Sequence, residues 1–182
     1  MGNLLRQTFG DFTLFISDNA STDRTGEIVR GLAAKDSRIV YHRQSENIGA
    51  VRNFDFVLAQ AKAPYVVFAA HDDQWSDDYL EKLYTQATAA ARISLAVPRV
   101  VLTFADGQPD ITLPVPDHAF KKNRFLRVLS LLHWVNGCWF YGLYRREALM
   151  EAMARARRFN YVWAVDLVAI TPLILNDQIA TD

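Results

Sequence analysis

The sequence predicts an α/β domain, because short β-rich runs alternate with amphipathic helical stretches through residues 1–90. Strand, helix, strand, helix and strand at this spacing are typical of a layered fold with a largely parallel sheet. With 182 residues, 51% of them hydrophobic, the chain can bury a core of its own. We therefore expect one domain over residues 1–182, with a mostly parallel central sheet flanked by helices.

Each element of the first half rests on a local pattern. The strands are runs of β-branched and aromatic residues, and the helices carry apolar residues three or four positions apart. The third strand is apolar without alternation, as in a strand covered on both faces. The expected elements are strands at residues 12–16, 38–42 and 65–70 and helices at residues 23–34, at residues 50–61 and after Trp75, the last capped by Ser76.

The second half, residues 91–182, is less regular. Pro172 is expected to kink or interrupt the last helix, because proline lacks the backbone N–H that a helix needs. The expected elements are one or two strands within residues 93–104, a Pro- and Asp-rich loop at 105–117, a helix around 125–132, an aromatic strand at 137–144 and helices at 145–157 and 163–176.

Composition excludes several classes of protein. The chain has 20 Lys and Arg residues and 20 Asp and Glu residues. It therefore lacks the net positive charge that is typical of nucleic-acid-binding proteins. No run approaches the ~18 apolar residues that span a bilayer, and the N-terminus lacks the apolar stretch of a signal peptide. The single cysteine, Cys138, cannot form an internal disulfide, which favours a reducing compartment. We expect a cytoplasmic protein that does not bind nucleic acid.

Two acidic segments follow expected strands. Asp72 and Asp73 come directly after the strand at residues 65–70, and Asp18 follows the strand at residues 12–16. In open α/β sheets the ligand crevice lies beyond the carboxyl ends of the strands. Adjacent carboxylates repel unless a cation compensates, and Mg²⁺ or Mn²⁺ holding a diphosphate would do so. The alternatives are a solvated turn at Asp72 and an Asx-turn around Asp18.

Together these segments resemble the family-2 glycosyltransferases, an inverting group with the GT-A nucleotide-sugar fold. The resemblance extends over residues 7–84, and its strings are QTF at residues 7–9, FISDNASTD at 15–23, NIGAVRN at 47–53 and YVVFAAHDDQW at 65–75. In that family a strand and most of a helix precede the first string. The resemblance therefore implies that the first strand–helix unit is missing, and the end at residue 182 suggests a truncated C-terminus as well.

The resemblance also implies roles for individual residues. Asp18, Asn19, Arg52 and Asp72 would bind the nucleotide-sugar donor, with Asp18 on the base. Asp72 would be the last acid of the family's Asp-x-Asp motif and, with Asp73 beside it, would hold Mn²⁺ or Mg²⁺ on the donor diphosphate. The first acid of the motif is replaced by Ala70.

The resemblance places the catalytic base at the start of a helix in the second half. Asp166 matches best, as the general base for the acceptor hydroxyl, although the usual Glu-Asp pair is here Val165-Asp166. Asp117 and Asp177 are the alternatives. Residues 137–142 match the acceptor-side segment, with aromatics that either stack on a sugar or belong to the core.

Basic residues of the second half have two interpretations. They face either the anionic groups of a membrane or lipid-linked acceptor, or only solvent. These residues are Lys121, Lys122, Arg124, Arg127, Arg155, Arg157 and Arg158.

The sequence thus predicts a metal-dependent inverting glycosyltransferase that uses a nucleotide-diphosphate sugar in bacterial cell-surface polysaccharide synthesis. Its acceptor would be a saccharide or a lipid-linked saccharide, with peripheral membrane contact. The alternative is a catalytically impaired remnant that binds a nucleotide or a partner, which Ala70 and the altered pair at Asp166 favour.

Overall fold

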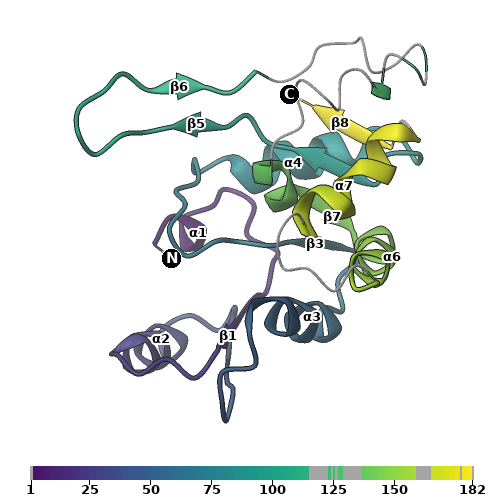
Figure 1. Ribbon diagram of the computed structural model, residues 1–182. Helices are drawn as coiled ribbons and strands as arrows, with labels where there is room; N and C mark the ends of the chain where they lie inside the picture. The colour runs from purple at the N-terminus through teal and green to yellow at the C-terminus, as the bar shows by residue number, and fades with distance from the viewer. Residues whose placement is uncertain are drawn as a thin grey trace. The chain divides into compact units, whose positions relative to one another are not determined.

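The computed structural model describes residues 2–114, 123, 125, 127–128, 137–158, 165–176 and 178–181 (Figure 1). The chain divides into two compact units. One is Phe9–Lys62, and the other comprises Met1–Thr8 and Ala63–Asp182. The division expected from the sequence, into a nucleotide-sugar-binding half at residues 1–90 and an acceptor-binding half at residues 91–182, stays a prediction.

The unit Phe9–Lys62 is a β–α–β–α segment with a parallel pair of strands. Its elements are β1 (Leu14–Asp18), α2 (Thr25–Ala33), β2 (Ile39–Arg43) and α3 (Ala50–Gln60). The register of the strand pair sets Leu14 opposite Ile39 and Asp18 opposite Arg43. All four elements expected from the sequence are present, with both strands starting slightly later than expected.

The apolar core of this unit is small. Its buried hydrophobic side chains are Val29, Ile39 and Leu58. The ring of Phe56 on α3 lies 4.6 Å from His42 and 6.1 Å from Phe15, centroid to centroid. Because so little apolar surface is buried here, polar contacts contribute much of the stability of the β1–β2 pair.

Among its described residues, the larger unit contains a four-stranded sheet and three helices of ten or eleven residues. Its elements are α1 (Gly2–Leu5), β3 (Tyr65–Val67), α4 (Tyr79–Thr88), β4 (Leu95–Val97), β5 (Val101–Leu102), β6 (Ile111–Thr112), the 3₁₀ helix η2 (Gly137–Tyr141), β7 (Leu143–Arg145), α6 (Arg146–Ala156), α7 (Val165–Leu175) and β8 (Ile179–Thr181).

The sheet has the order β3-β7-β4-β8, and β7 is antiparallel to both of its neighbours, whereas β4 and β8 are parallel. Tyr144 of β7 lies opposite Val66 on one side and Leu95 on the other. The α/β class is therefore confirmed, and the sheet is mixed where a mostly parallel one was expected.

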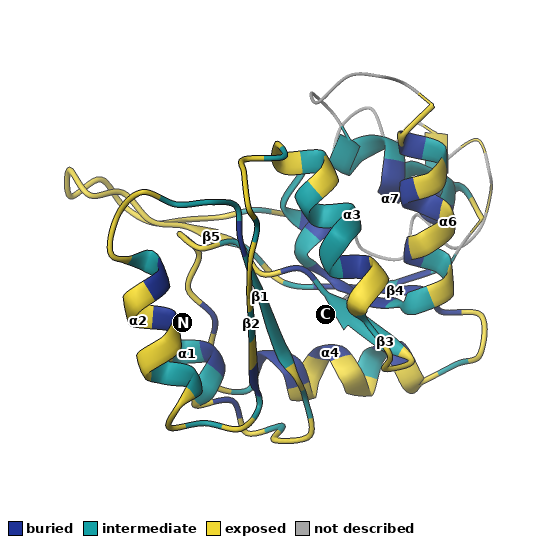
Figure 2. Ribbon diagram, turned by 90° about the horizontal axis from the view of Figure 1, so that it is seen from below, coloured by how far each residue is buried: buried dark blue, intermediate teal, exposed yellow. Residues whose placement is uncertain are grey.

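The core of this unit lies on both faces of the sheet. All three residues of β4 are fully buried. Helix α4 covers one face, and α6 and α7 lie on the other (Figure 2). The buried side chains that these helices contribute include Leu83, Ala87, Leu149, Met153, Ile170 and Ile174. Each large apolar side chain buried in this way contributes roughly 1.5–3 kcal/mol to stability.

Several expected elements differ from those observed. The aromatic run 137–144, expected as a strand, forms η2 over its first five residues and enters β7 only at Leu143. Gly142 lies between them, where a Cβ would overlap the backbone carbonyl of Ala96. The chain therefore approaches the backbone of β4 closely at Gly142, just before β7.

The loop expected at residues 105–117 contains β6, which pairs with β5 in an exposed hairpin. Helix α7 is continuous across Pro172, because its packing outweighs the lost hydrogen bond. The strand β3 ends at Val67, three residues early. Of the helix expected around 125–132, residues 125, 127 and 128 are helical, and the others lie outside the described residues.

The N-terminus of α4 is capped by a residue that the sequence pattern did not indicate. Ser76 was expected as the cap, but its hydroxyl donates to the Asp78 carboxylate instead. Gln7 supplies the contacts: its Oε1 accepts from the Leu80 N–H at 2.8 Å, and its Nε2 donates to the Ser76 carbonyl at 2.6 Å. The buried Gln7 amide thereby ties residues 2–8 to α4.

Within the described part of the chain, no helix combines the length and the apolar character needed to cross a bilayer.

Candidate functional site

Asp18 is the centre of a buried polar cluster in the unit Phe9–Lys62. Its side chain has no exposed surface. Oδ1 accepts from the Ser21 N–H at 2.8 Å, and Oδ2 accepts from the Tyr41 hydroxyl and from Nη1 of Arg43, both at 2.7 Å. Tyr41 and Arg43 are two positions apart on β2 and so share a face of the strand. The parallel register brings that face to Asp18.

These contacts keep the Asp18 carboxylate ionised. Burial alone would raise the pKa of Asp18, but the hydrogen bonds from Ser21 and Tyr41 and the charge of Arg43 outweigh it and lower the pKa to about 2. Arg43 also donates to the Ser21 carbonyl at 2.7 Å, which closes the turn after β1. A carboxylate offers about four lone-pair sites, and three of them are used by the protein.

Asn19 joins the turn after β1 to the loop before α3. Its Nδ2 donates to Oδ1 of Asn47 at 2.9 Å, and its Oδ1 accepts from the Ile48 N–H at 2.9 Å. Gly49 then adopts a φ of 82°, a conformation that favours glycine, directly before the first turn of α3. The predicted Arg52 lies in that first turn with an exposed side chain.

Asp72 and Asp73 lie in the larger unit, on the segment that follows β3. The Asp72 side chain is 75% exposed, and its Oδ1 lies 3.8 Å from Nδ1 of His71, whose own side chain is 98% exposed. Desolvation and then the charge of Asp72 raise the pKa of Asp73. The two carboxylates thus repel each other in a place that a solvent-borne ligand can reach.

The charges of acids from distant parts of the sequence act on residues of the 3₁₀ helix η2. Burial and then the charges of Asp73, Asp72 and Asp166 raise the pKa of Tyr141. The thiol of Cys138 has its pKa raised by burial and then by Asp73 and Asp166. The predicted metal-binding acids and the predicted catalytic acid therefore all lie near enough to η2 for their charges to act on it.

Aromatic residues at the start of α4 and just before it support η2. The Tyr79 hydroxyl donates to the Tyr141 backbone carbonyl, and Trp75 packs beside Tyr79 with ring centroids 6.3 Å apart. Phe68, just after β3, stacks on Phe140 at 5.1 Å. Both contacts connect η2 to the chain on either side of Asp72 and Asp73, which fixes the acids relative to the turn.

Asp166 is the second residue of α7, and its side chain is half-buried. Its Oδ1 accepts from the Leu167 N–H at 2.9 Å, so the carboxylate folds back on the first turn of the helix. The positive end of the helix dipole favours a negative charge there. The competing candidates Asp117 and Asp177 lie outside the described residues, as do Lys121, Lys122 and Arg124.

The donor set at Asp72 and Asp73 fits a divalent cation that a ligand helps to hold. Within the residues that the structure describes, no three His, Cys, Asp or Glu side chains are grouped closely enough to hold a metal ion. Mg²⁺ and Mn²⁺ are commonly held by one or two carboxylates together with phosphate oxygens and water. Two adjacent, mutually repelling carboxylates match that requirement.

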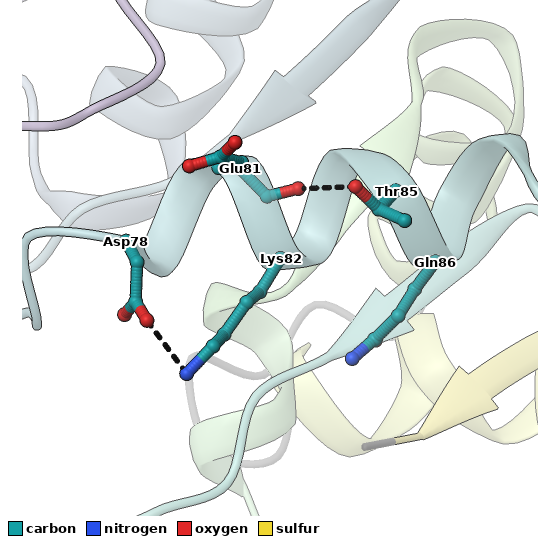
Figure 3. A pocket seen from close by; sticks show the side chains of 5 residues that line it. All are labelled: Asp78, Glu81, Lys82, Thr85 and Gln86. Carbon is teal, nitrogen blue, oxygen red and sulfur yellow. Dashed lines mark hydrogen bonds and ion pairs between the residues drawn. The ribbon is translucent and has the colours of Figure 1, made fainter.

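A surface hollow of about 330 Å³ lies elsewhere, along α4 (Figure 3). Its lining residues are Asp78, Glu81, Lys82, Thr85 and Gln86. Lys82 pairs with Asp78 at 2.7 Å, and the Thr85 hydroxyl donates to the Glu81 carbonyl at 2.9 Å. None of the predicted site residues lines this hollow, and within the described residues Oε1 of Gln86 is buried there without a hydrogen-bond partner.

Sequence reasoning missed the residues that support the predicted ones. Tyr41 and Arg43 could have been found from the alternation along β2 and its pairing with β1. Tyr79 was not singled out from the sequence, and no local pattern indicates that its hydroxyl reaches the Tyr141 carbonyl.

Comparison with solved structures identifies the class. The S. aureus protein TarS, in a crystal structure of its residues 1–349 in complex with UDP, superposes with a TM-score of 0.68 at 18% identity, over 100% of this chain and 52% of that one. The fold is therefore the GT-A fold of glycosyltransferases.

Comparison of sequences identifies the family. Residues 2–153 match Glycosyl transferase family 2, and the chain belongs to that family. The putative teichuronic acid biosynthesis glycosyltransferase TuaG of Bacillus subtilis is 35% identical over 80 residues, which are 44% of this chain and 32% of TuaG. The UDP-Glc:alpha-D-GlcNAc-diphosphoundecaprenol beta-1,3-glucosyltransferase WfaP of Escherichia coli is 35% identical over 71 residues, 39% of this chain and 28% of WfaP. The matched stretches thus span about a third or less of these curated relatives.

Proposed function

We propose that this chain transfers a sugar from a nucleotide-diphosphate sugar to an acceptor hydroxyl, with inversion at the anomeric carbon. The observation that carries the proposal is that Asp73, Asp72 and Asp166 all lie near enough to η2 for their charges, after burial, to raise the pKa of Tyr141. A sugar transferase needs one acidic group for the charge of the departing diphosphate and another for the acceptor proton.

Asp72 and Asp73 hold the donor through a divalent cation. The exposed Asp72 carboxylate and the neighbouring Asp73 would bind Mn²⁺ or Mg²⁺ together with diphosphate oxygens. A cation bound there neutralises charge on the departing nucleoside diphosphate. His71, exposed beside Asp72, could contribute a hydrogen bond to the same ligand.

Asp166 acts as the general base. Its carboxylate takes the proton of the acceptor hydroxyl while that oxygen attacks the anomeric carbon, and the bond from this carbon to the diphosphate oxygen breaks. Attack from the face opposite the leaving group inverts the configuration in a single displacement. The hydrogen bond from Leu167 holds one carboxylate oxygen, which leaves the other to receive the proton.

The nucleotide itself is assigned to the unit Phe9–Lys62. Asp18 has one lone-pair site beyond its three protein donors, which a nucleobase N–H can occupy. The guanidinium of Arg52 is exposed in the first turn of α3, as a contact to a nucleotide requires. Asn19 shapes the turn by bridging to Asn47.

The relatives support a role in bacterial cell-surface polysaccharide synthesis for this chain. TuaG is named for teichuronic acid biosynthesis, and the name of WfaP specifies a UDP-sugar donor and a lipid-diphosphate-linked sugar acceptor. By analogy we assign a saccharide or lipid-linked saccharide acceptor here. A lipid-linked acceptor would require peripheral contact with the membrane at its cytoplasmic face.

Isothermal titration calorimetry with UDP and GDP tests the donor assignment. We expect one of the two nucleotides to bind, with affinity that rises at least tenfold when Mn²⁺ is added, because the cation joins the carboxylates to the diphosphate. Asp72→Ala should abolish the Mn²⁺ dependence, whereas Asp106→Ala, which removes an exposed acid from the β5–β6 hairpin turn, should not. Binding that ignores both Mn²⁺ and Asp72→Ala would overturn the assignment.

The second candidate function is a catalytically impaired remnant that only binds a nucleotide or partner. Two observations favour it: Ala70 replaces the first acid of the motif, and protein donors already occupy most of the Asp18 carboxylate. Sugar transfer or donor hydrolysis by the purified protein, lost on Asp166→Asn, would exclude this candidate.

A further inference from the structure

Gly137 and Asp166 are in direct contact at the start of η2 and of α7. A Cβ built on Gly137 would overlap Oδ2 of Asp166 and would lie 3.4 Å from its Cγ. The carboxylate therefore occupies the space in which any other residue at position 137 would place its side chain. Oδ1 of the same carboxylate is held by the Leu167 N–H.

We propose that Gly137 is a positioning residue for Asp166: the absent side chain at position 137 leaves the space in which the Asp166 carboxylate is fixed against η2. The inference rests on the proposed function, in which Asp166 is the general base. Oδ1 is held by its own helix, and Oδ2 lies beside Gly137 at the start of the turn that carries Cys138 and Tyr141. A larger residue at 137 would push the carboxylate away from this turn.

The other glycines provide matched comparisons. A Cβ on Gly31 of α2 would meet nothing within 4 Å, so Gly31→Ala is a control that introduces no steric overlap. A Cβ on Gly142 would overlap the backbone carbonyl of Ala96, so Gly142→Ala damages the sheet without touching Asp166. Gly137 differs from both, because the atoms its Cβ would meet belong to the side chain of the proposed base.

Thermal unfolding tests the contact independently of activity. Alanine forms helices better than glycine, so local propensity alone predicts that Gly137→Ala is neutral or stabilising. We expect instead that Gly137→Ala is less favourable to Tm in the wild-type background than in the Asp166→Ala background, because the Asp166 carboxylate must move aside only where it is present. The same change of Tm in both backgrounds would overturn the contact.

Steady-state kinetics test the positioning role. UDP release from UDP-GlcNAc and UDP-glucose, with and without Mn²⁺, would be measured for the full chain. Displacing the carboxylate should lower kcat of Gly137→Ala by about 100-fold, because a misplacement of about 1 Å has that effect, while KM for the donor changes little. Gly31→Ala should match wild type. Combining Gly137→Ala with Asp166→Asn should lower kcat no further than Asp166→Asn alone.

The outcomes separate the two levels of the proposal. If Asp166→Asn abolishes turnover while folded Gly137→Ala retains wild-type kcat, the positioning role fails and the proposed function stands. The unfolding measurements can also show coupling between positions 137 and 166 while Asp166→Asn turns over normally. In that case the contact is confirmed, but the assignment of Asp166 as the base and the positioning role both fail. Losses of kcat in Gly137→Ala and Gly142→Ala that both follow loss of folded protein would also overturn the role.

Discussion

Asp166→Asn is expected to lower kcat by about 10²–10⁴-fold, the contribution of a well-placed general base. The asparagine has nearly the same shape as aspartate, and its amide oxygen can still accept from the Leu167 N–H, so the first turn of α7 is preserved. What is lost is the capacity to take the proton of the acceptor hydroxyl. The KM for the donor should change little, because Asp72 and Asp73 remain. Initial rates of UDP release, with and without acceptor, provide the measurement.

The matched controls are the two acids that sequence reasoning left as alternatives. Asp117→Asn and Asp177→Asn should both keep more than about a tenth of wild-type kcat if Asp166 is the base. A full loss in either control, with Asp166→Asn active, would transfer the role to that residue. Circular dichroism of each variant checks that the fold is retained.

Asp18→Asn is expected to destabilise the protein by about 2–3 kcal/mol at pH 7. The Asp18 carboxylate accepts from Ser21, Tyr41 and Arg43, and an amide would turn a donor toward one of these donors. The unit Phe9–Lys62 has few buried apolar side chains to compensate. Urea unfolding followed by circular dichroism measures the change, and hydrogen exchange of the β1 and β2 amides locates it. The exposed Asp11→Asn, in the same unit, should change stability by less than about 0.5 kcal/mol.

The same substitution has a predicted pH dependence. The pKa of Asp18 is lowered to about 2 from an ordinary 3.8, so its ionised form stabilises the fold fully above the ordinary value. That contribution is lost as pH falls through about 2. The stability difference between wild type and Asp18→Asn should therefore shrink progressively below pH 4. A constant difference down to pH 2 would contradict the lowered pKa.

Sequence patterns predicted the elements whose formation depends mainly on residues close together in the chain. Helices α2, α3 and α6 each carry an apolar stripe, and all three are present near their expected bounds. The run 137–144 was read as a strand because aromatic residues favour strands. Its first five residues form η2 instead, held by the Tyr79 hydroxyl and by the stacking of Phe68 on Phe140. Such tertiary contacts leave no periodic signal in the sequence.

In the candidate site, likewise, the sequence indicates the residues but not their arrangement in space. Asp72, Asp73 and Asp166 were selected by their positions after a strand and at a helix start, together with the resemblance. Their common effect on Tyr141 depends on how β3, η2 and α7 pack, which no local pattern specifies. The sequence also does not indicate that the Asp166 carboxylate occupies the space beside Gly137. A glycine in an aromatic run indicates only a break in a strand.

Paramagnetic broadening by Mn²⁺ tests the central claim, that Asp72 and Asp73 hold the donor diphosphate through a cation at η2. Amide NMR spectra would be recorded with UDP and substoichiometric Mn²⁺, with Mg²⁺ as the diamagnetic control. We predict that the resonances of Asp72, Asp73 and residues 138–141 broaden first, and that Asp72→Ala abolishes the selective broadening. Selective broadening elsewhere, or the same pattern in Asp72→Ala, would contradict the claim.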